Sequence, residues 1–148
     1  MGPRSDSITV IVGRTLVIAK PDATERGLIG EIIGRLENKG LRIVAADLRV
    51  IDESLAERHY AEHIGKSFYP ELVAFIGRSP SLVMVVEGPA DTFKQVRALM
   101  GATNPSDALP GTIRGDLATE VTENLVHGSD SEESASREIG IFFPGLDS

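Results

Sequence analysis

Apolar residues form short continuous runs at several places in the chain. Three of these runs lie at 15–21 (TLVIAKP), 41–51 (LRIVAADLRVI) and 81–88 (SLVMVVEG). Short apolar runs that are rich in β-branched residues and bounded by turn residues are typical of buried β-strands. We predict a fourth and last strand at 117–127 (LATEVTENLVH).

Other apolar residues recur at the three- and four-residue spacing of an amphipathic helix. This spacing runs through the segment before Gly40, which marks the predicted end of that helix. Ser54 and Glu57 match a capping box, so we predict that Ser54 is an N-cap. The predicted helices are 24–40, 54–63, 69–77, 89–101 and 129–143.

The order of the predicted elements reduces to βαββαβ, with further helices around this core. That order predicts an α+β sandwich of the ferredoxin-like kind, with a four-stranded antiparallel sheet. Residues 102–116 contain two prolines and two glycines and form a predicted loop; a long loop in a compact domain is usually functional. We assign 14–148 to a single domain. Residues 1–13 form an N-terminal extension, in which ITVIV either adds an edge strand or stays mobile.

The chain has 148 residues, a net charge of −7 and no cysteine. The negative charge argues against binding to nucleic acid or anionic membranes through bulk electrostatics. No segment approaches the ~18 apolar residues of a membrane span, and disulfides and thiolate metal sites are excluded. We therefore expect a cytoplasmic protein with no membrane or nucleic-acid partner. Any anion that it binds must meet a local cluster of basic side chains.

The stretch 59–67 (HYAEHIGKS) contains fragments of two known motifs. His59, Glu62 and His63 form H-x-x-E-H, the ligand pattern of one class of zinc peptidases, and residues four apart share a helix face. A zinc hydrolase using these residues is therefore an alternative function, although no specific third ligand is evident. The GKS fragment lacks the first glycine of a phosphate-binding loop, because Tyr60 occupies that position.

His127 ends the predicted last strand and is followed by Gly128, which has no side chain. Ser129 and Asp130 then begin the predicted final helix, whose free N–H groups attract anions. An unperturbed imidazole has a pKa of ~6.5, so its neutral, nucleophilic form is abundant at pH 7. The segment suits phosphate chemistry; the alternative is an ordinary capping serine beside a partly exposed histidine.

Five blocks of the sequence, taken together and in order, resemble the nucleoside diphosphate kinase family. The most specific is NLVHGSDS at 124–131, which matches the active-site signature N-x-x-H-G-S-D of these enzymes. The resemblance covers about residues 14–145. The other four blocks are RTLVIAKPDATERGLIGEII, HYAEHIGKSFYPELVAFI, GATNPSDALPGTIRGD and REIGIFFPG.

The resemblance implies an enzyme that moves the terminal phosphate of a nucleoside triphosphate to a nucleoside diphosphate. The implied mechanism is ping-pong, through a phosphohistidine at His127. Glu138 is implied to orient the histidine ring, with Ser129 beside it and Tyr60 nearby. A carboxylate contact of this kind fixes the tautomer of a histidine and supports its basicity.

The resemblance also assigns the groups that bind the nucleotide. Lys20 and Asn124 are implied to hold the sugar hydroxyls, and Lys20 also favours the transferring phosphate. An apolar clamp on the base makes no hydrogen bonds to base edges, so broad base specificity is implied. The remaining assignments are Arg97, Arg114 and Thr103 for the phosphates, and Phe68 and Leu72 for the base.

Several wider expectations follow from the resemblance. The substrates are ATP, GTP and other nucleotides, with Mg²⁺ carried by the phosphates rather than by a dedicated protein site. The chain is expected to form a homo-oligomer, with a hexamer as the first choice and a tetramer or dimer as alternatives. Segment 89–101 is one residue longer than is typical, so Arg97 is placed by its distance from Gly101. A catalytically silent, nucleotide-binding member of the family remains a further alternative.

Overall fold

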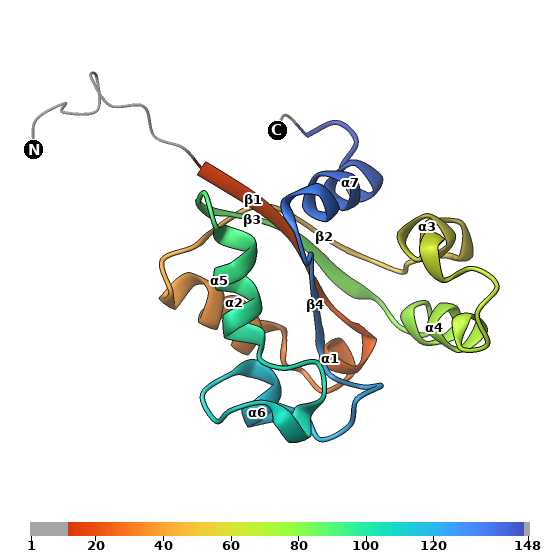
Figure 1. Ribbon diagram of the computed structural model, residues 1–148, viewed down its shortest axis with the longest axis horizontal. Coiled ribbons are helices and arrows are strands. Elements are labelled where there is room, and N and C mark those ends of the chain that lie inside the picture. Colours follow the sequence, from red (N-terminus) through yellow and green to blue (C-terminus); the bar gives the residue numbers. More distant parts are fainter. Residues whose placement is uncertain (1–11, 147–148) are drawn as a thin grey trace, which may run out of the picture.

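A four-stranded antiparallel sheet lies at the centre of the computed structural model, which describes residues 12–146 (Figure 1). The strand order is β2-β3-β1-β4, and this order with βαββαβ connectivity confirms the predicted ferredoxin-like core. None of the described helices is long and apolar enough to cross a membrane. The strands are β1 Val12–Ala19, β2 Arg42–Arg49, β3 Ser81–Pro89 and β4 Val126–Gly128. The helices are α1 Pro21–Glu25, α2 Ile29–Asn38, α3 Glu53–His59, α4 Tyr69–Ile76, α5 Thr92–Met100, α6 Ile113–Leu117 and α7 Glu132–Phe142, with 3₁₀ turns η2 Ala61–His63 and η3 Pro105–Asp107.

Both faces of the sheet are buried, which explains why its central strands are continuously apolar. Along β1, Val17 and Ala19 face a core that includes residues of α2 and α5. Leu16 and Ile18 face a second core, made with residues of α3, α4 and α7. Successive side chains of a strand point to opposite faces, so a strand between two helical layers needs apolar residues at every position.

The N-terminal extension predicted for 1–13 lies outside the described residues, apart from its last two positions. Val12 and Gly13 belong to β1, where they pair with Pro89 and Gly88 of β3. The expected edge strand in ITVIV therefore falls almost wholly outside the described part of the chain. The pairing with Val12 also keeps Pro89 in the sheet. The next helix consequently begins at Thr92 rather than at the predicted Pro89.

Three other predicted helices have different boundaries in the structure. The segment 24–40 is interrupted at Gly27, whose φ of 70° breaks it into α1 and α2. The N-cap of α3 is Asp52, whose side chain accepts a hydrogen bond from the Leu55 N–H at 2.9 Å, so Ser54 is not the cap. The final helix begins after Ser131, because the Ser129 N–H is bonded to Leu16 O at the end of the sheet.

The last strand and the loop before it were predicted at the wrong lengths. The structure contains only Val126–Gly128 as β4, and residues 118–125 form neither helix nor strand. The segment 102–116 is not without structure, since η3 and most of α6 lie within it. Thr112 caps α6 by accepting a hydrogen bond from the Gly115 N–H at 3.0 Å.

Leu125 shortens the last strand because its backbone turns out of the sheet direction. It is the one described non-glycine residue with a positive φ, 75°, a conformation that costs free energy for a residue with a side chain. The Leu125 N–H donates to the Asp22 carboxylate at 3.0 Å, and Leu125 O accepts from the Lys20 N–H at 2.8 Å. Asp22 is buried, so this contact holds the turn that delivers the chain into β4.

We predict that Asp22→Ala lowers the free energy of unfolding by about 1–3 kcal/mol, because it leaves the buried Leu125 N–H without an acceptor. Urea unfolding measures the loss. Asp22→Asn keeps an acceptor oxygen of the same reach, so its loss is expected to be smaller. Equal stability of the wild type and Asp22→Ala would contradict this account of the turn.

Candidate active site

His127 owes its position to the alternation of side chains along β4. Val126 belongs to the core formed with α2 and α5, and His127 points to the opposite side of the sheet. A Cβ on Gly128 would lie 2.8 Å from the Met100 sulfur, so α5 can pack this closely only against a glycine. The short strand therefore buries Val126 and Gly128 on one face of the sheet. It directs the His127 side chain from the other face toward α3 and α7.

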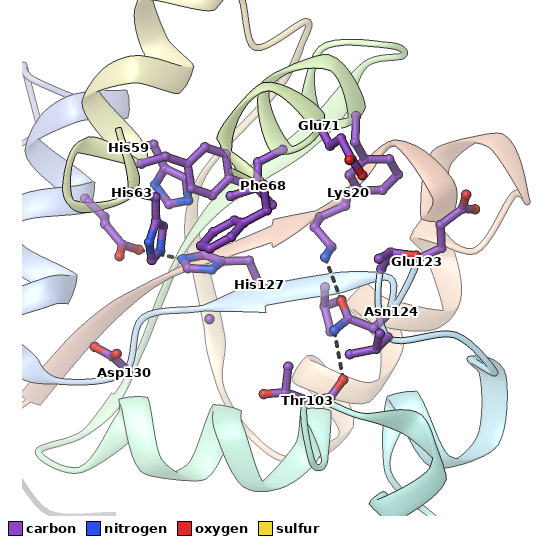
Figure 2. Close-up of a pocket in the computed structure, with 18 of the residues that line it drawn as sticks. Lys20, His59, His63, Phe68, Glu71, Thr103, Glu123, Asn124, His127 and Asp130 are labelled. Atoms are coloured by element: carbon purple, nitrogen blue, oxygen red, sulfur yellow. Dashed lines mark hydrogen bonds and ion pairs between the residues drawn. The ribbon is translucent and has the colours of Figure 1, made fainter. Parts of the chain in front are cut away.

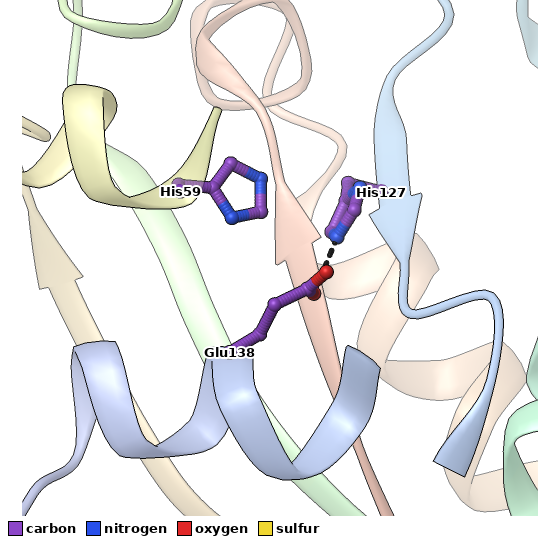
Figure 3. A group of neighbouring side chains, drawn as sticks. All are labelled: His59, His127 and Glu138. Carbon is purple, nitrogen blue, oxygen red and sulfur yellow. Dashed lines mark hydrogen bonds and ion pairs between the residues drawn. The ribbon is translucent and has the colours of Figure 1, made fainter. Parts of the chain in front are cut away.

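A buried carboxylate holds the His127 ring (Figure 3). The Nε2 atom of His127 lies 2.7 Å from Glu138 Oε1, and the Ser129 hydroxyl donates to the same oxygen at 2.9 Å. Burial by itself raises the pKa of Glu138, but the hydrogen bonds that it accepts from His127 and Ser129 outweigh burial and lower the pKa below its usual value. An ionised Glu138 accepts the Nε2–H of His127, which leaves the lone pair of the neutral ring on Nδ1.

His127 and Glu138 border a pocket of about 750 Å³ (Figure 2). The pocket brings together ten of the eleven site residues that the sequence predicted. The exception is Ser129, which is fully buried behind Glu138 and reaches the site only through it. The ten lining residues are Lys20, Tyr60, Phe68, Leu72, Arg97, Thr103, Arg114, Asn124, His127 and Glu138.

A chain of hydrogen bonds crosses one wall of the pocket (Figure 2). Lys20 Nζ donates to Asn124 Oδ1 at 2.6 Å, and Asn124 Nδ2 donates to Thr103 O at 2.9 Å. Burial, with a smaller contribution from the nearby Arg114 charge, lowers the pKa of Lys20 to about 8. Lys20 is therefore mostly charged at pH 7, but it holds its proton less firmly than an exposed lysine.

The two predicted phosphate-binding arginines are anchored by backbone carbonyls. Arg114 donates from Nε, Nη1 and Nη2 to the carbonyl oxygens of Asn124, Gly101 and Val126. Arg97 donates to Gly128 O at 3.1 Å. Burial and the charge of Arg97 lower the pKa of Arg114 to about 10. A guanidinium has five N–H groups, so these bonds fix both side chains and still leave N–H groups for an anion.

The structure does not support the H-x-x-E-H zinc interpretation. His59 ends α3 and is buried, whereas His63 lies in the separate turn η2 and Glu62 is exposed. Among the described residues, His59 instead belongs to a cluster with His127 and Glu138. The GKS fragment lies in the turns between η2 and α4. The two motif fragments in this stretch are therefore coincidental.

Aromatic and aliphatic side chains form the mouth of the pocket on the α4 side. Phe68 is 45% exposed although it is a large apolar residue, and it lies beside Leu72 in the pocket lining. Phe75 also lines the pocket, and Lys20 Nζ lies 5.6 Å from the centre of its ring. An exposed aromatic at a pocket mouth suits the stacking of a planar ligand.

Phe75, Arg137 and His59 are among the lining residues that the sequence prediction missed. Helical spacing was a usable signal for Phe75, which lies three residues after Leu72 on the same helix. Arg137 directly precedes Glu138, but nothing in the sequence shows that both of them border the pocket. His59 was singled out, but for a site that the fold does not form.

Comparison with known proteins gives a consistent result. A family model described as nucleoside diphosphate kinase matches residues 13–147. The nucleoside diphosphate kinase of Corynebacterium diphtheriae is 60% identical over 134 residues, which cover 90% of this chain and 98% of the relative. The one from Parafrankia is 55% identical over 133 residues, covering 90% and 96%. A structure of a halophilic nucleoside diphosphate kinase from Halobacterium salinarum in complex with CDP matches with a TM-score of 0.87 and 50% identity, and the match covers 93% of each chain.

We predict that the affinity for a nucleoside diphosphate falls as Lys20 loses its charge. The pKa of Lys20 is about 8, so the ammonium is present at pH 7 and is lost as the pH rises through that value. The loss of one charge-assisted hydrogen bond weakens affinity about tenfold or more. Calorimetric titration with a nucleoside diphosphate from pH 7 to 9.5 measures the effect. Lys20→Met is expected to bind weakly at pH 7 and to show no further fall; an equally flat wild-type profile would contradict the role of Lys20.

Proposed function

The chain belongs to the nucleoside diphosphate kinase family, and we propose that His127 is the residue that carries the phosphate between two nucleotides. The enzyme transfers the terminal phosphate of a nucleoside triphosphate to a nucleoside diphosphate. The observation that supports His127 is its 2.7 Å contact with Glu138 at the edge of a pocket that Arg97 and Arg114 also line. The side chain of His127 is 29% exposed, so the ring is both held and accessible.

Nδ1 of His127 is the proposed attacking atom, because Glu138 occupies Nε2. The Nδ1 lone pair forms a bond to the terminal phosphorus as the bond from that phosphorus to the bridging oxygen breaks. The nucleoside diphosphate leaves with the electron pair of that bond. In the second half-reaction, a terminal oxygen of another nucleoside diphosphate attacks the phosphorus and returns His127 to its starting state. Glu138 acts through the ring, since its ionised form stabilises the positive charge that develops on the imidazole.

Fixed positive charge is the second requirement, because phosphoryl transfer depends on positioning and on stabilising charge spread over the phosphate oxygens. Lys20, Arg97 and Arg114 line the same pocket as His127. We assign both arginines to the phosphates of the nucleotide, with Thr103 as a hydroxyl donor. Lys20 is proposed to reach the transferring phosphate. This local cluster of positive charge would allow a chain with a net charge of −7 to bind a polyanion.

The sugar and base are assigned to the remaining lining residues. Asn124 and Lys20, already bonded to each other at 2.6 Å, are proposed to hold the sugar hydroxyls. Phe68 and Leu72 are proposed to clamp the base through their apolar surfaces. Such a clamp reads no donor or acceptor on the base edge, so broad base specificity is expected. Tyr60, which packs against the second core, is proposed to wall the histidine end of the pocket.

Phosphoryl transfer of this kind uses a divalent cation, and we propose Mg²⁺. The ion would be held mainly by the nucleotide, since Mg²⁺ keeps much of its water and needs only one or two carboxylates. Asp130, an exposed carboxylate in the pocket lining three residues from His127, suits that contact. Bound Mg²⁺ would neutralise charge on the phosphates.

We also propose a cytoplasmic enzyme whose single domain, 14–148, forms a homo-oligomer, with a hexamer as the first expectation from its family.

Incubation with γ-labelled ATP and Mg²⁺, followed by removal of the nucleotide, is predicted to leave label on His127. Phosphohistidine is acid-labile and base-stable, so treatment of the labelled protein at both extremes of pH identifies the bond. Any nucleoside diphosphate is expected to discharge the label. His127→Asn is expected to abolish labelling, while it keeps a side chain able to hydrogen-bond with Glu138. Full labelling of His127→Asn would rule out this assignment.

Phe68→Ala is predicted to raise KM about tenfold for ATP, GTP and CTP alike, with kcat nearly unchanged, because the loss of one stacking face costs about 1–3 kcal/mol for any base. Steady-state kinetics with the three nucleotides test this. Lys66→Ala serves as the matched control, since Lys66 lies 5.9 Å from the centre of the Phe68 ring but does not line the pocket. An effect confined to one base would contradict the apolar clamp.

A further inference from the structure

Three potential metal ligands from three different elements meet beside the proposed phosphate carrier. They are His59 at the end of α3, His127 on β4 and Glu138 in α7 (Figure 3). One ligand atom from each lies within 4.8 Å of the other two. Nothing in the proposed phosphate transfer uses His59, so its place in this cluster calls for a separate explanation.

His59 is a buried polar side chain that has no hydrogen-bond partner for one of its nitrogens. Only 5% of it is exposed, and its Nδ1 atom is fully buried without a partner among the described residues. Burial, followed by the neighbouring His127, lowers the pKa of His59 to about 3, so the ring is neutral. A neutral imidazole nitrogen is the form that binds a transition metal. The ring meets His127 edge-on, with centres 4.7 Å apart.

We propose that His59, His127 and Glu138 form a Zn²⁺ site whose occupation inhibits the enzyme. Two histidines and one carboxylate are an established ligand set for zinc, with bonds of about 2.0–2.2 Å and a fourth position open to solvent. Tetrahedral ligands at such distances lie about 3.4 Å apart. The distance of 2.7 Å between His127 Nε2 and Glu138 Oε1 must therefore lengthen slightly. Ligand atoms that lie as far as 4.8 Å apart must approach each other by about 1.4 Å. Rotations of the three side chains would supply both movements.

Of the two neighbours of Glu138, Ser129 favours metal binding at this site and Arg137 opposes it. The Ser129 hydroxyl holds Oε1 at 2.9 Å, and a hydrogen-bonded carboxylate is better oriented as a metal ligand. Arg137 lies 3.7 Å from the other oxygen, Oε2, and its charge opposes a cation. We therefore expect reversible binding rather than the very tight binding of a structural zinc site.

Inhibition follows from the two nitrogens of His127, and this step rests on the proposed function. Zinc can bind Nε2 only through a lone pair, so the proton on Nε2 must leave. In the neutral, metal-bound ring that proton is carried on Nδ1, the atom proposed to attack phosphorus. With its lone pair removed, Nδ1 cannot form the bond to phosphate. Zinc binding and phosphate transfer are therefore mutually exclusive on the same ring.

Calorimetric titration of the full chain with ZnCl₂ in the absence of nucleotide tests the site itself. One ion per chain is expected for the wild type. His59→Phe keeps an aromatic ring in the buried position and is expected to weaken binding at least about tenfold, the effect of disturbing a metal site. Glu62→Gln is the matched control from the H-x-x-E-H stretch and is expected to bind like the wild type. Loss of binding in Glu62→Gln, or none in His59→Phe, would overturn the proposal.

Nitrogen NMR of the histidine rings gives a second readout that does not depend on the folding of a variant. In the wild type, zinc is expected to shift the ring nitrogens of His59 and His127 and to leave those of His63 in place. Shifts at His63 without shifts at His59 would overturn the site.

Labelling with ATP then tests inhibition separately from binding. The initial rate of His127 labelling is compared with and without zinc, in the wild type and in His59→Phe, each relative to its own zinc-free rate. Any effect of zinc on the nucleotide appears equally in both proteins. A fall confined to the wild type and reversed by a chelator is expected; an equal fall in both would overturn the inhibitory role. Failure of labelling without zinc would refute the proposed function instead, and the zinc titration would still stand.

Discussion

The buried carboxylate of Glu138 is the constraint around which the site is assembled. Only 4% of this residue is exposed, and an ionised carboxylate at such a position requires partners. Ser129 and His127 supply them, and Ser129 in turn bonds through its N–H to Leu16 O of β1. The requirement to satisfy one charge thus fixes α7 against the end of the sheet. The same hydrogen bonds that stabilise the buried charge of Glu138 also orient the His127 ring.

The opposite wall of the pocket presents the reverse problem, because it concentrates positive charge. Lys20 and Arg114 both have lowered pKa values, in each case because of burial first and a neighbouring cation second. Bonds from Arg114 to three carbonyl oxygens offset part of this cost. We propose that the remaining cost favours the binding of phosphate, because an anion would offset the buried positive charge and the cationic groups are already in place to receive it.

The sequence alone was sufficient for the topology, since the central strands β1 and β3 are buried on both faces and carry unbroken apolar runs, and the edge strand β2 is rich in β-branched and apolar residues. It was insufficient where a contact distant in the chain overrides local preference. The last strand was predicted at 117–127, yet it begins at Val126 because Asp22, about a hundred residues earlier, holds Leu125 at a φ of 75°. The site residues were found through a block resemblance. His59 lies in one of these blocks, but the resemblance gave it no role. Its position beside His127 became evident only when the fold brought α3 and β4 together.

Under our proposals, the division of donor atoms in the pocket determines which residues meet Mg²⁺ and which bind Zn²⁺. The nitrogen donors His59 and His127 lie beside the buried Glu138, whereas the carboxylate of Asp130 is exposed in the lining. A hard, strongly hydrated ion such as Mg²⁺ gains little from imidazole and stays with oxygen ligands and water. A softer ion such as Zn²⁺ gains most from the two nitrogens. The bond that fixes the tautomer of His127 also brings a carboxylate next to an imidazole, so an oriented nucleophile and sensitivity to nitrogen-binding metals arise from one arrangement.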